Sequence, residues 1–281
     1  SPEIEAAAGS LAARFAALGL AVEFHDFAVQ GHPMRNVVAT QLGAAAPDSI
    51  VVVCAHYDCT SEDPYELAPG ADDNASGTAV VLTAAELLAP LSCRYTVKYL
   101  CFAGEEQGLR GSQAWVADAA AQGLAIVAAL NFDMAGWWTP GVDFDVEIEA
   151  DEASVWLADI VVAAASTYTD MPFELHVYDG AWWGDHASFW QYGYAALNHE
   201  EAWDWGDADF NPRYHSTGDR LEHLDPDFVV GNARLAVAAL ATLARPGLGV
   251  AVADVPAPVV TLRVAPNPFN GRLQVAAVGA G

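Results

Sequence analysis

The sequence predicts an α/β fold with a mixed, mainly parallel central β-sheet and helices on both faces. The first observation is a set of continuous apolar runs, at residues 49–55, 95–102 and 126–132. Such runs are typical of strands that are buried on both faces. The second observation is that helix-like segments rich in small apolar residues lie among these runs, at residues 77–91 and 109–122. Strands that alternate with helices indicate parallel strands joined by crossover helices.

The remaining predicted elements flank this central pattern. Residues 3–19 predict a helix, because their apolar side chains recur near helical spacing and Gly19 ends the pattern. Two strand-like runs come next, at residues 21–27 and 34–41. The later part of the chain predicts strands at residues 142–149, 173–178 and 194–197, and helices at residues 154–167, 186–192 and 227–244.

The character of the chain changes after Arg245. A Pro-Gly pair follows at once, and the proline-rich stretch at residues 255–258 is typical of a linker. Two short strands are predicted beyond it, at residues 259–264 and 273–277. Because about 30 residues are too few for a core of their own, we expect two parts. Residues 1–248 form the main domain, and residues 249–281 form a linker and the truncated start of a second, β-type module.

Composition excludes several classes of partner. The chain has 281 residues, a formal net charge of -26 and a single lysine, Lys98. Nucleic acid and anionic membrane surfaces repel such a chain. No apolar run approaches the roughly 18 residues that span a bilayer, so no transmembrane segment is predicted. The first residues lack the pattern of a signal peptide, so the signal of an exported protein would be absent from this chain.

The four cysteines leave two interpretations open. Cys54, Cys59, Cys93 and Cys101 match neither a zinc knuckle nor a redox pair. Three pairings into disulfides are possible, and spacing does not choose among them. In the alternative interpretation, Cys54 and Cys101 are ordinary buried thiols inside apolar strands.

Chemistry-bearing residues follow the buried strands, where ligands bind in α/β sheets. His56 and Asp58 follow the first apolar run. One of them could bind a metal while the other braces it, since a metal-bound imidazole usually donates its second N–H to an oxygen. The alternative is a solvated histidine beside a turn.

The segment Gly70-Ala71-Asp72-Asp73-Asn74-Ala75-Ser76-Gly77 crowds acidic and small residues at the entry to a helix. Helix capping by Asp73, Asn74 or Ser76 needs no metal. Capping does not require two adjacent aspartates, however. The functional hypothesis is that Asp72 places one carboxylate oxygen on each of two metal ions.

Three further segments complete the set. Glu105 and Glu106 follow a buried strand, and if Glu106 binds a metal, Glu105 is free to act as a base. Asp133 closes another apolar strand, and His215 lies in a turn before the last helix. Each is more often structural when taken alone. Together, two histidines, three carboxylates and a spare glutamate supply nitrogen and oxygen ligands for two zinc ions.

These motifs resemble, in the same order, those of the co-catalytic di-zinc aminopeptidases of metallopeptidase family 28, such as bacterial leucine aminopeptidases. The resemblance spans about residues 1–245. It rests on His56-x-Asp58, the segment 70–77, the segment 104–112, Asn131-x-Asp133, Asp185-His186-Ala187-Ser188-Phe189 and Tyr214-His215-Ser216-Thr217.

The resemblance implies a role for each matching residue. Asp72 would bridge two Zn²⁺ ions, one of which also binds His56 and Asp133 and the other Glu106 and His215. It also implies that the Asp72–Asp73 peptide bond is cis. Three further assignments follow: Glu105 is the general base, Asp58 orients His56, and Tyr214 steadies the tetrahedral intermediate. Asp185 would support the site from behind.

The implied activity is that of a zinc metallo-exopeptidase. A water shared by the two zinc ions would lose a proton to Glu105, and the hydroxide would hydrolyse the N-terminal peptide bond of substrates with a free N-terminus. The alternative function is that of a single-zinc glutaminyl cyclase, an acyltransferase. The ligands His56 and Asp133 argue against it, because they provide for a second metal.

One departure from the family pattern, one further resemblance and two expectations remain. Some relatives carry a disulfide just before the Asp185 segment, whereas this chain has Trp182 and Trp183 there. These side chains either rebuild the pocket for the first substrate residue or simply pack. The segment 265–270 resembles the start of C-terminal sorting or immunoglobulin-like modules. We therefore expect a secreted bacterial enzyme, and we expect a monomer.

Overall fold

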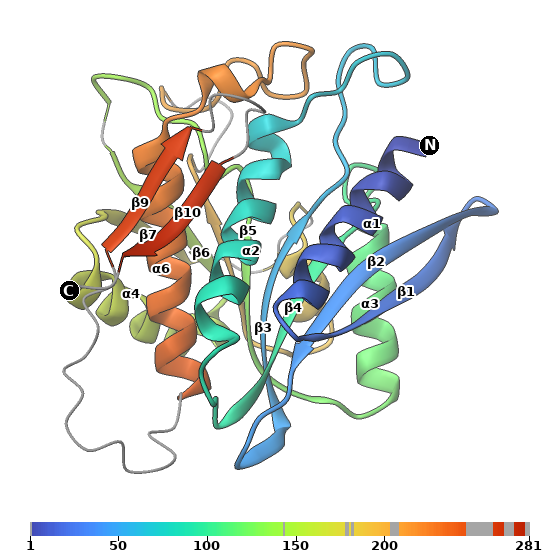
Figure 1. Ribbon diagram of the computed structural model, residues 1–281, viewed down its shortest axis with the longest axis vertical. Coiled ribbons are helices and arrows are strands. Elements are labelled where there is room, and N and C mark those ends of the chain that lie inside the picture. The colour runs from blue at the N-terminus through green and yellow to red at the C-terminus, as the bar shows by residue number, and fades with distance from the viewer. Residues whose placement is uncertain are drawn as a thin grey trace.

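The computed structural model contains a mixed sheet of eight strands with helices on both faces (Figure 1). It describes residues 2–142, 144–177, 180, 183–202 and 208–245, together with the backbone of two strands near the C-terminus. The strand order is β1-β2-β4-β3-β5-β8-β6-β7. The strands are β1 (Ala21–Val29), β2 (His32–Gln41), β3 (Ala46–His56), β4 (Tyr95–Phe102), β5 (Ala125–Phe132), β6 (Val146–Ala150), β7 (Phe173–Val177) and β8 (Ala196–Glu200).

The four strands at the centre of the sheet are parallel to one another, and the strand on either side of these four runs antiparallel to them. β4, β3, β5 and β8 run in the same direction, whereas β2 pairs antiparallel with β4, and β6 pairs antiparallel with β8. The chain places β4 on one side of β3 and β5 on the other. In such a sheet the chain continues on opposite sides of a central strand, and ligands bind at the carboxyl ends of the strands where this change occurs. The predicted fold class is therefore confirmed, and the predicted ligands follow the strands at these carboxyl ends.

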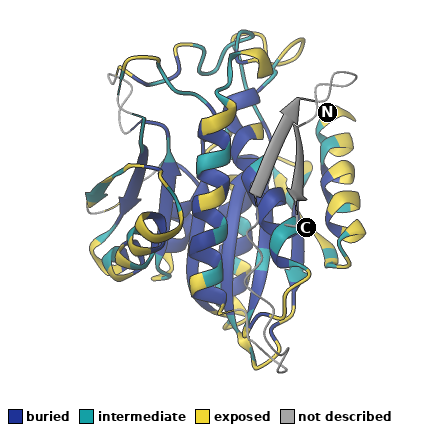
Figure 2. Ribbon diagram, turned by 60° about the vertical axis from the view of Figure 1, so that its left-hand side comes forward, coloured by how far each residue is buried: buried dark blue, intermediate teal, exposed yellow. Residues whose placement is uncertain are grey.

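Helices cover the two faces unequally. The helices are α1 (Pro2–Ala17), α2 (Gly77–Leu88), α3 (Arg110–Ala121), α4 (Val155–Tyr168), α5 (His186–Gln191) and α6 (Pro226–Ala244), with short helical turns η1 (Ala71–Ser76), η2 (Glu152–Ser154) and η3 (Leu221–His223). Residues of α1, α2, α4 and α6 enter one core cluster, and residues of α3 and α5 enter the other. Figure 2 shows the central strands as the most continuously buried part of the chain.

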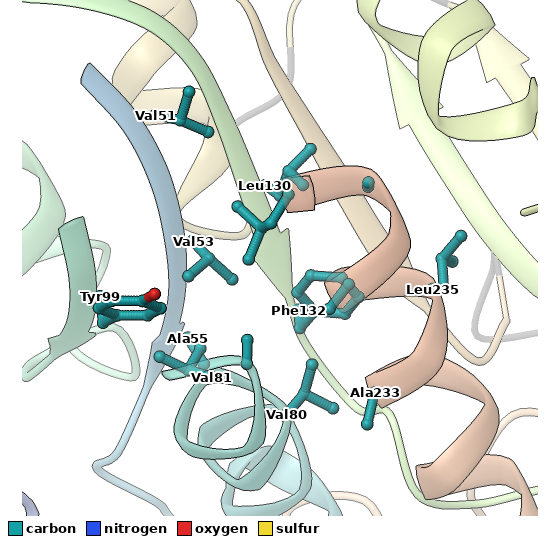
Figure 3. Close-up of a cluster of buried hydrophobic side chains, with 14 of the residues drawn as sticks. Val51, Val53, Ala55, Val80, Val81, Tyr99, Leu130, Phe132, Ala233 and Leu235 are labelled. Atoms are coloured by element: carbon teal, nitrogen blue, oxygen red, sulfur yellow. The ribbon is translucent and has the colours of Figure 1, made fainter. Parts of the chain in front are cut away.

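The continuous apolar runs are explained by this two-sided burial. Along β3, Val51 and Val53 face the larger core, and Val52 and Cys54 face the smaller one. Figure 3 shows the larger core, where Val53 of β3, Leu130 of β5 and side chains of α2 and α6 lie close together. A strand with helices on both faces has no polar face to alternate with.

α6 is long and apolar enough to cross a membrane by length and composition alone. In the structure, 61% of that apolar stretch is buried, and the helix packs against α2 and α4. This is the position of a core helix, so its apolar sequence is explained by packing within the fold.

All four cysteines lie in described residues, and none forms a disulfide. Cys54 and Cys101 lie on neighbouring strands, but they belong to different core clusters and so face opposite sides of the sheet. The interpretation of both as buried thiols is confirmed, and no pairing of cysteines is present.

Two differences from the sequence prediction concern the ends of elements. β8 extends to Glu200, whereas the predicted strand stops at residue 197, because Asn198 and His199 are polar yet fully buried. Near the C-terminus, β9 (Thr261–Pro266) and β10 (Leu273–Val278) form an antiparallel pair, close to the predicted strands. The predicted linker at residues 255–258 lies outside the described residues.

Candidate metal centre

Three of the predicted ligands lie at the carboxyl ends of neighbouring parallel strands. His56 is the last residue of β3, Glu106 comes four residues after β4, and Asp133 follows β5 directly. Asp133 is also tied to the next strand, since its N–H donates to the carbonyl oxygen of His199 at 3.0 Å. The sheet itself thus brings these side chains to one edge.

His56, Asp73 and Asp133 form a first group of possible ligands. The Nε2 atom of His56 lies 3.1 Å from Asp73 Oδ1 and 3.2 Å from Asp133 Oδ1. The other ring nitrogen, Nδ1, lies 3.0 Å from the carbonyl oxygen of Asp58. Because Nδ1 can donate its proton to that carbonyl, Nε2 is left as the nitrogen that can bind a metal.

Asp73, Glu106 and His215 form a second group. The Nε2 atom of His215 lies 3.1 Å from Asp73 Oδ2 and 3.0 Å from Glu106 Oε2. Each oxygen of the Asp73 carboxylate therefore faces a different histidine. Asp73 is the residue common to both groups.

This geometry corrects the choice of Asp72 as the shared residue. The carboxylate of Asp72 is turned away and accepts hydrogen bonds from Gly136 N and Asn211 Nδ2, each at 2.8 Å. The cis peptide bond joins Asp73 and Asn74, and not Asp72 and Asp73 as the resemblance implied. Two adjacent aspartates look alike in a sequence, and the non-helical backbone of Asp73 and Asn74 decides which one faces the histidines.

Glu105 belongs to neither group, as expected for a spare base. Its backbone N–H donates to Asp58 Oδ1 at 3.2 Å, and the N–H of Glu106 donates to Asp58 Oδ2 at 3.4 Å. Asp58 was predicted to orient His56, and its carbonyl is the group that does so, while its carboxylate lies 3.7 Å from the ring. The Asp58 side chain instead holds the turn that carries both glutamates.

The electrostatics of the groups follow from buried opposite charges. Burial lowers the pKa of His56, but the charge of Asp133 and hydrogen bonds to Asp133 and Asp73 outweigh it and raise the pKa well above its ordinary value. Burial likewise opposes the hydrogen bonds of His215 to Asp73 and Glu106, which raise its pKa to about 10. Burial raises the pKa of Glu105, and neighbouring carboxylates add to the effect of burial.

Of the three remaining predicted residues, Tyr214 contacts a ligand directly. The ring of Tyr214 stacks on that of His215 with centroids 3.6 Å apart, and burial and the nearby Asp73 raise its pKa. Asp185 is fully buried, and burial raises its pKa to about 7 against the lowering effect of His56. Trp183 donates from Nε1 to Glu149 of β6 at 3.2 Å. Trp182 lies outside the described residues.

The residues present fit two metal ions of the zinc type. Each group offers one imidazole nitrogen and two carboxylate oxygens within 4.8 Å of one another, which is the donor set of catalytic zinc sites. Glu106 Oε1 is buried and has no hydrogen-bond partner among the described residues, so one oxygen remains for a ligand. A third group, Glu147, Glu174 and His176, lies on β6 and β7. There His176 Nε2 and Glu147 Oε2 form a 2.6 Å ion pair.

Sequence reasoning missed residues that join these loops. Asn211, Asp219 and Glu201 are each at most 2% exposed. Asp219 accepts from the N–H groups of Asp72 and Asp73, and Glu201 accepts from Asn211 N at 2.7 Å. Asp219 comes two residues after the Tyr214-His215-Ser216-Thr217 motif, which is the signal that the sequence offers, but its partners lie too far away along the chain to be predicted from spacing.

Known proteins similar to this chain share its fold. A probable leucine aminopeptidase of Trichophyton verrucosum is 33% identical over 211 residues, which is 72% of this chain and 55% of that protein. LapA of Legionella pneumophila matches with a TM-score of 0.72 and 24% identity, over 84% of this chain and 65% of that one. The chain thus spans about half the length of the curated relatives it matches.

Two other solved structures bear on the choice of activity. A zinc aminopeptidase from Bacillus subtilis matches with a TM-score of 0.65 and 25% identity, over 77% of this chain and 52% of that one. A glutaminyl cyclase of Fimbriiglobus ruber has the same TM-score at 16% identity, over 86% of this chain and 88% of that one. Fold similarity alone therefore does not separate the two activities. A family model described as peptidase family M28 matches residues 36–240, and the chain belongs to that family.

Proposed function

We propose that this chain is a zinc-dependent aminopeptidase that releases the first residue of peptides with a free N-terminus. The observation that carries the proposal is the pair of ligand groups that share Asp73, with Glu105 beside them and outside both. A single-metal enzyme needs only one such group. The zinc aminopeptidase and leucine aminopeptidase named above support the same activity.

The side chains divide the work of peptide hydrolysis. When bound, zinc ions polarise the scissile carbonyl and lower the pKa of water. Glu105 accepts a proton from that water at its carboxylate and later gives it to the leaving amine. Asp58 holds the Glu105 turn through two backbone N–H groups, so the base keeps its distance from the ligands. We assign to Tyr214, whose ring stacks on that of His215, the donation of a hydrogen bond to the developing oxyanion.

The excess of carboxylates suits the substrate. Asp73, Asp133, Glu105 and Glu106 gather at one edge of the sheet, and an α-ammonium group is attracted to such an edge. Trp183, just before α5, remains our candidate for the wall of the pocket that receives the first side chain. The residue preferred there is left for experiment.

The test uses a panel of amino-acid anilides with the chelated and the zinc-restored protein. We expect activity to disappear with chelation and to return with zinc. Glu105→Gln should lower kcat by about 10²–10⁴-fold, because the amide cannot take a proton, while bound zinc stays unchanged. A Glu105→Gln variant with full activity would refute the mechanism.

The second candidate is a glutaminyl cyclase that uses one zinc ion. It is favoured by the match to the Fimbriiglobus ruber enzyme, which covers most of both chains. One zinc per chain together with cyclisation of an N-terminal glutamine would establish it. Two zinc ions per chain with hydrolysis of the anilides would reject it.

The organisation beyond the metal centre is also a proposal. We infer that residues 1–248 form the catalytic domain and that residues 249–281 begin a sorting or immunoglobulin-like module. The antiparallel pair β9 and β10 supports a β-type module. Secretion from a bacterium remains a prediction, since the similar proteins include fungal and bacterial ones. A monomeric state is also still a prediction.

A further inference from the structure

His215, unlike His56 and Asp133, does not lie at the end of a strand of the sheet. It lies in an irregular loop between β8 and η3, and its backbone φ is 51°, in the left-handed region that non-glycine residues seldom adopt. A residue persists in that region only when the surrounding structure holds it there. Contacts from other residues must therefore hold this loop in place.

Both ends of a nine-residue span around His215 are joined to one residue, Asp72. Four positions before His215, Asn211 Nδ2 donates to Asp72 Oδ2 at 2.8 Å. Four positions after it, the Asp219 carboxylate accepts from Asp72 N, at 2.9 Å to Oδ1 and 3.2 Å to Oδ2. The side chain of Asp72 thus holds one end of the span and its backbone holds the other.

Asp219 adds contacts to the neighbouring residues. Its Oδ2 accepts from Asp73 N at 3.1 Å, and its carbonyl accepts from Ala71 N at 3.2 Å. Asp73 is the shared carboxylate of the two groups. Asp219 lies in the span that carries His215, and its carboxylate holds the segment that carries Asp73. This one residue therefore helps to set the distance between these two ligands.

We propose that Asp72, Asn211 and Asp219 form a clamp of positioning residues that sets the affinity of the second metal position. This inference rests on the proposed function. His56 and Asp133 stand on strand ends, so the first position depends less on the clamp. Glu106 and His215 depend on turns, and the second position should lose affinity when the clamp is weakened.

A loss of zinc affinity could come from lost positioning of the ligands or from a general loss of stability, so a control variant is needed. Asp225 also accepts two backbone N–H groups, those of Asp227 and Phe228, at the start of α6. Its carboxylate has the same kind of bond as Asp219 but holds no ligand segment. Asp225→Asn is therefore a matched control for Asp219→Asn.

The experiment measures zinc bound per chain in buffers of defined free zinc, without substrate. In Asp219→Asn an NH₂ group replaces one of the two carboxylate oxygens that accept from Asp72 N and Asp73 N, so at least one N–H group faces a donor. We expect the second zinc to bind about 10–100-fold more weakly, as for other partners that hold ligands. The first zinc should weaken by a smaller factor, because only Asp73 of its three ligands is held by the clamp, and neither zinc should bind more weakly in Asp225→Asn. Asn211→Ala removes the bond to Asp72 Oδ2 and the bond that Asn211 Oδ1 accepts from Arg213 N, and it should act on the same position.

The outcomes separate the clamp from the proposed function. Suppose that the wild type binds two zinc ions. If Asp219→Asn and Asn211→Ala keep both zinc affinities, or lose both equally, the clamp is refuted and the proposed function stands. If the wild type binds a single zinc ion, the two-metal function and the clamp both fail. Unfolding midpoints of the metal-free proteins show whether Asp219→Asn is merely less stable than the wild type. In that case the zinc affinities of Asn211→Ala decide whether the clamp exists.

Discussion

The two halves of the metal centre are held in different ways. In the first half, His56 ends β3 and Asp133 follows β5, and both strands are buried on both faces. In the second half, His215 lies in a loop and reaches the centre with a left-handed backbone. The ends of two buried strands thus supply two of the three ligands of the first half, and Asp73 is the third. The second half needs hydrogen bonds from distant residues, and these occupy Asp72, Asn211 and Asp219.

The largest expected effect comes from comparing the two adjacent aspartates. Asp73→Asn removes a charged oxygen donor from both positions, so both zinc ions should bind more weakly, by more than the roughly 10–100-fold typical of outer partners. Activity on anilides should fall to background. Asp72→Asn leaves both ligand groups complete and should weaken only the second position.

Zinc titration of the two variants in parallel checks this prediction. If Asp72→Asn lost both zinc ions while Asp73→Asn kept them, Asp72 would be the shared ligand after all. The pair therefore tests the correction that the geometry makes.

The comparison explains how much the sequence could predict. Strand positions and the residues that follow them could be predicted, because apolar runs fix where each buried strand ends. The choice between Asp72 and Asp73 could not, since it depends on the irregular backbone of Asp73 (φ −104°, ψ 89°). The clamp was also beyond reach, because Asn211 and Asp72 are 139 residues apart. Such contacts leave no periodic pattern in a sequence.

A smaller effect is expected at the turn that carries Glu105. Asp58→Asn replaces one of two accepting oxygens with a donor that faces an N–H group, so the turn should lose its fixed position. We expect kcat to fall by about 10–100-fold, since partners of this kind are worth that much, with the first zinc ion retained.

Steady-state kinetics and zinc content together check this expectation. Asp63→Asn, on an exposed loop, is the control and should behave as the wild type. An unchanged kcat in Asp58→Asn would mean that the turn is held without the Asp58 carboxylate.

The smallest expected effect is a pH dependence of the free energy of unfolding that comes from a buried histidine, His186. His186 is fully buried, and burial lowers its pKa to about 3, with His199 adding to this effect. The unfolded chain therefore binds a proton that the folded chain does not, between about pH 6.5 and 3. Stability is present above that range and is lost as the pH falls. At pH 5 the loss from His186 should be about 2 kcal/mol relative to pH 7.

Urea unfolding of the chelated protein at pH 7 and pH 5 measures this loss. Neither ring nitrogen of His186 has a hydrogen-bond partner among the described residues, so His186→Phe should remove the share of the pH dependence that comes from His186. The share of His199, whose pKa burial lowers to about 4, should remain. His32→Phe, at an exposed position, is the control. Equal pH dependence in the wild type and His186→Phe would contradict the assignment.

The sharing of Asp73 has a consequence for the chain before it acquires metal. Four carboxylates, those of Asp73, Asp133, Glu105 and Glu106, meet at this edge, more than two imidazoles can balance. Their repulsion favours local opening of this edge, while the buried strands beneath it stay closed. Zinc would thus complete the fold at this edge as well as the catalytic machinery, and amide hydrogen exchange there would slow first as the metal is taken up.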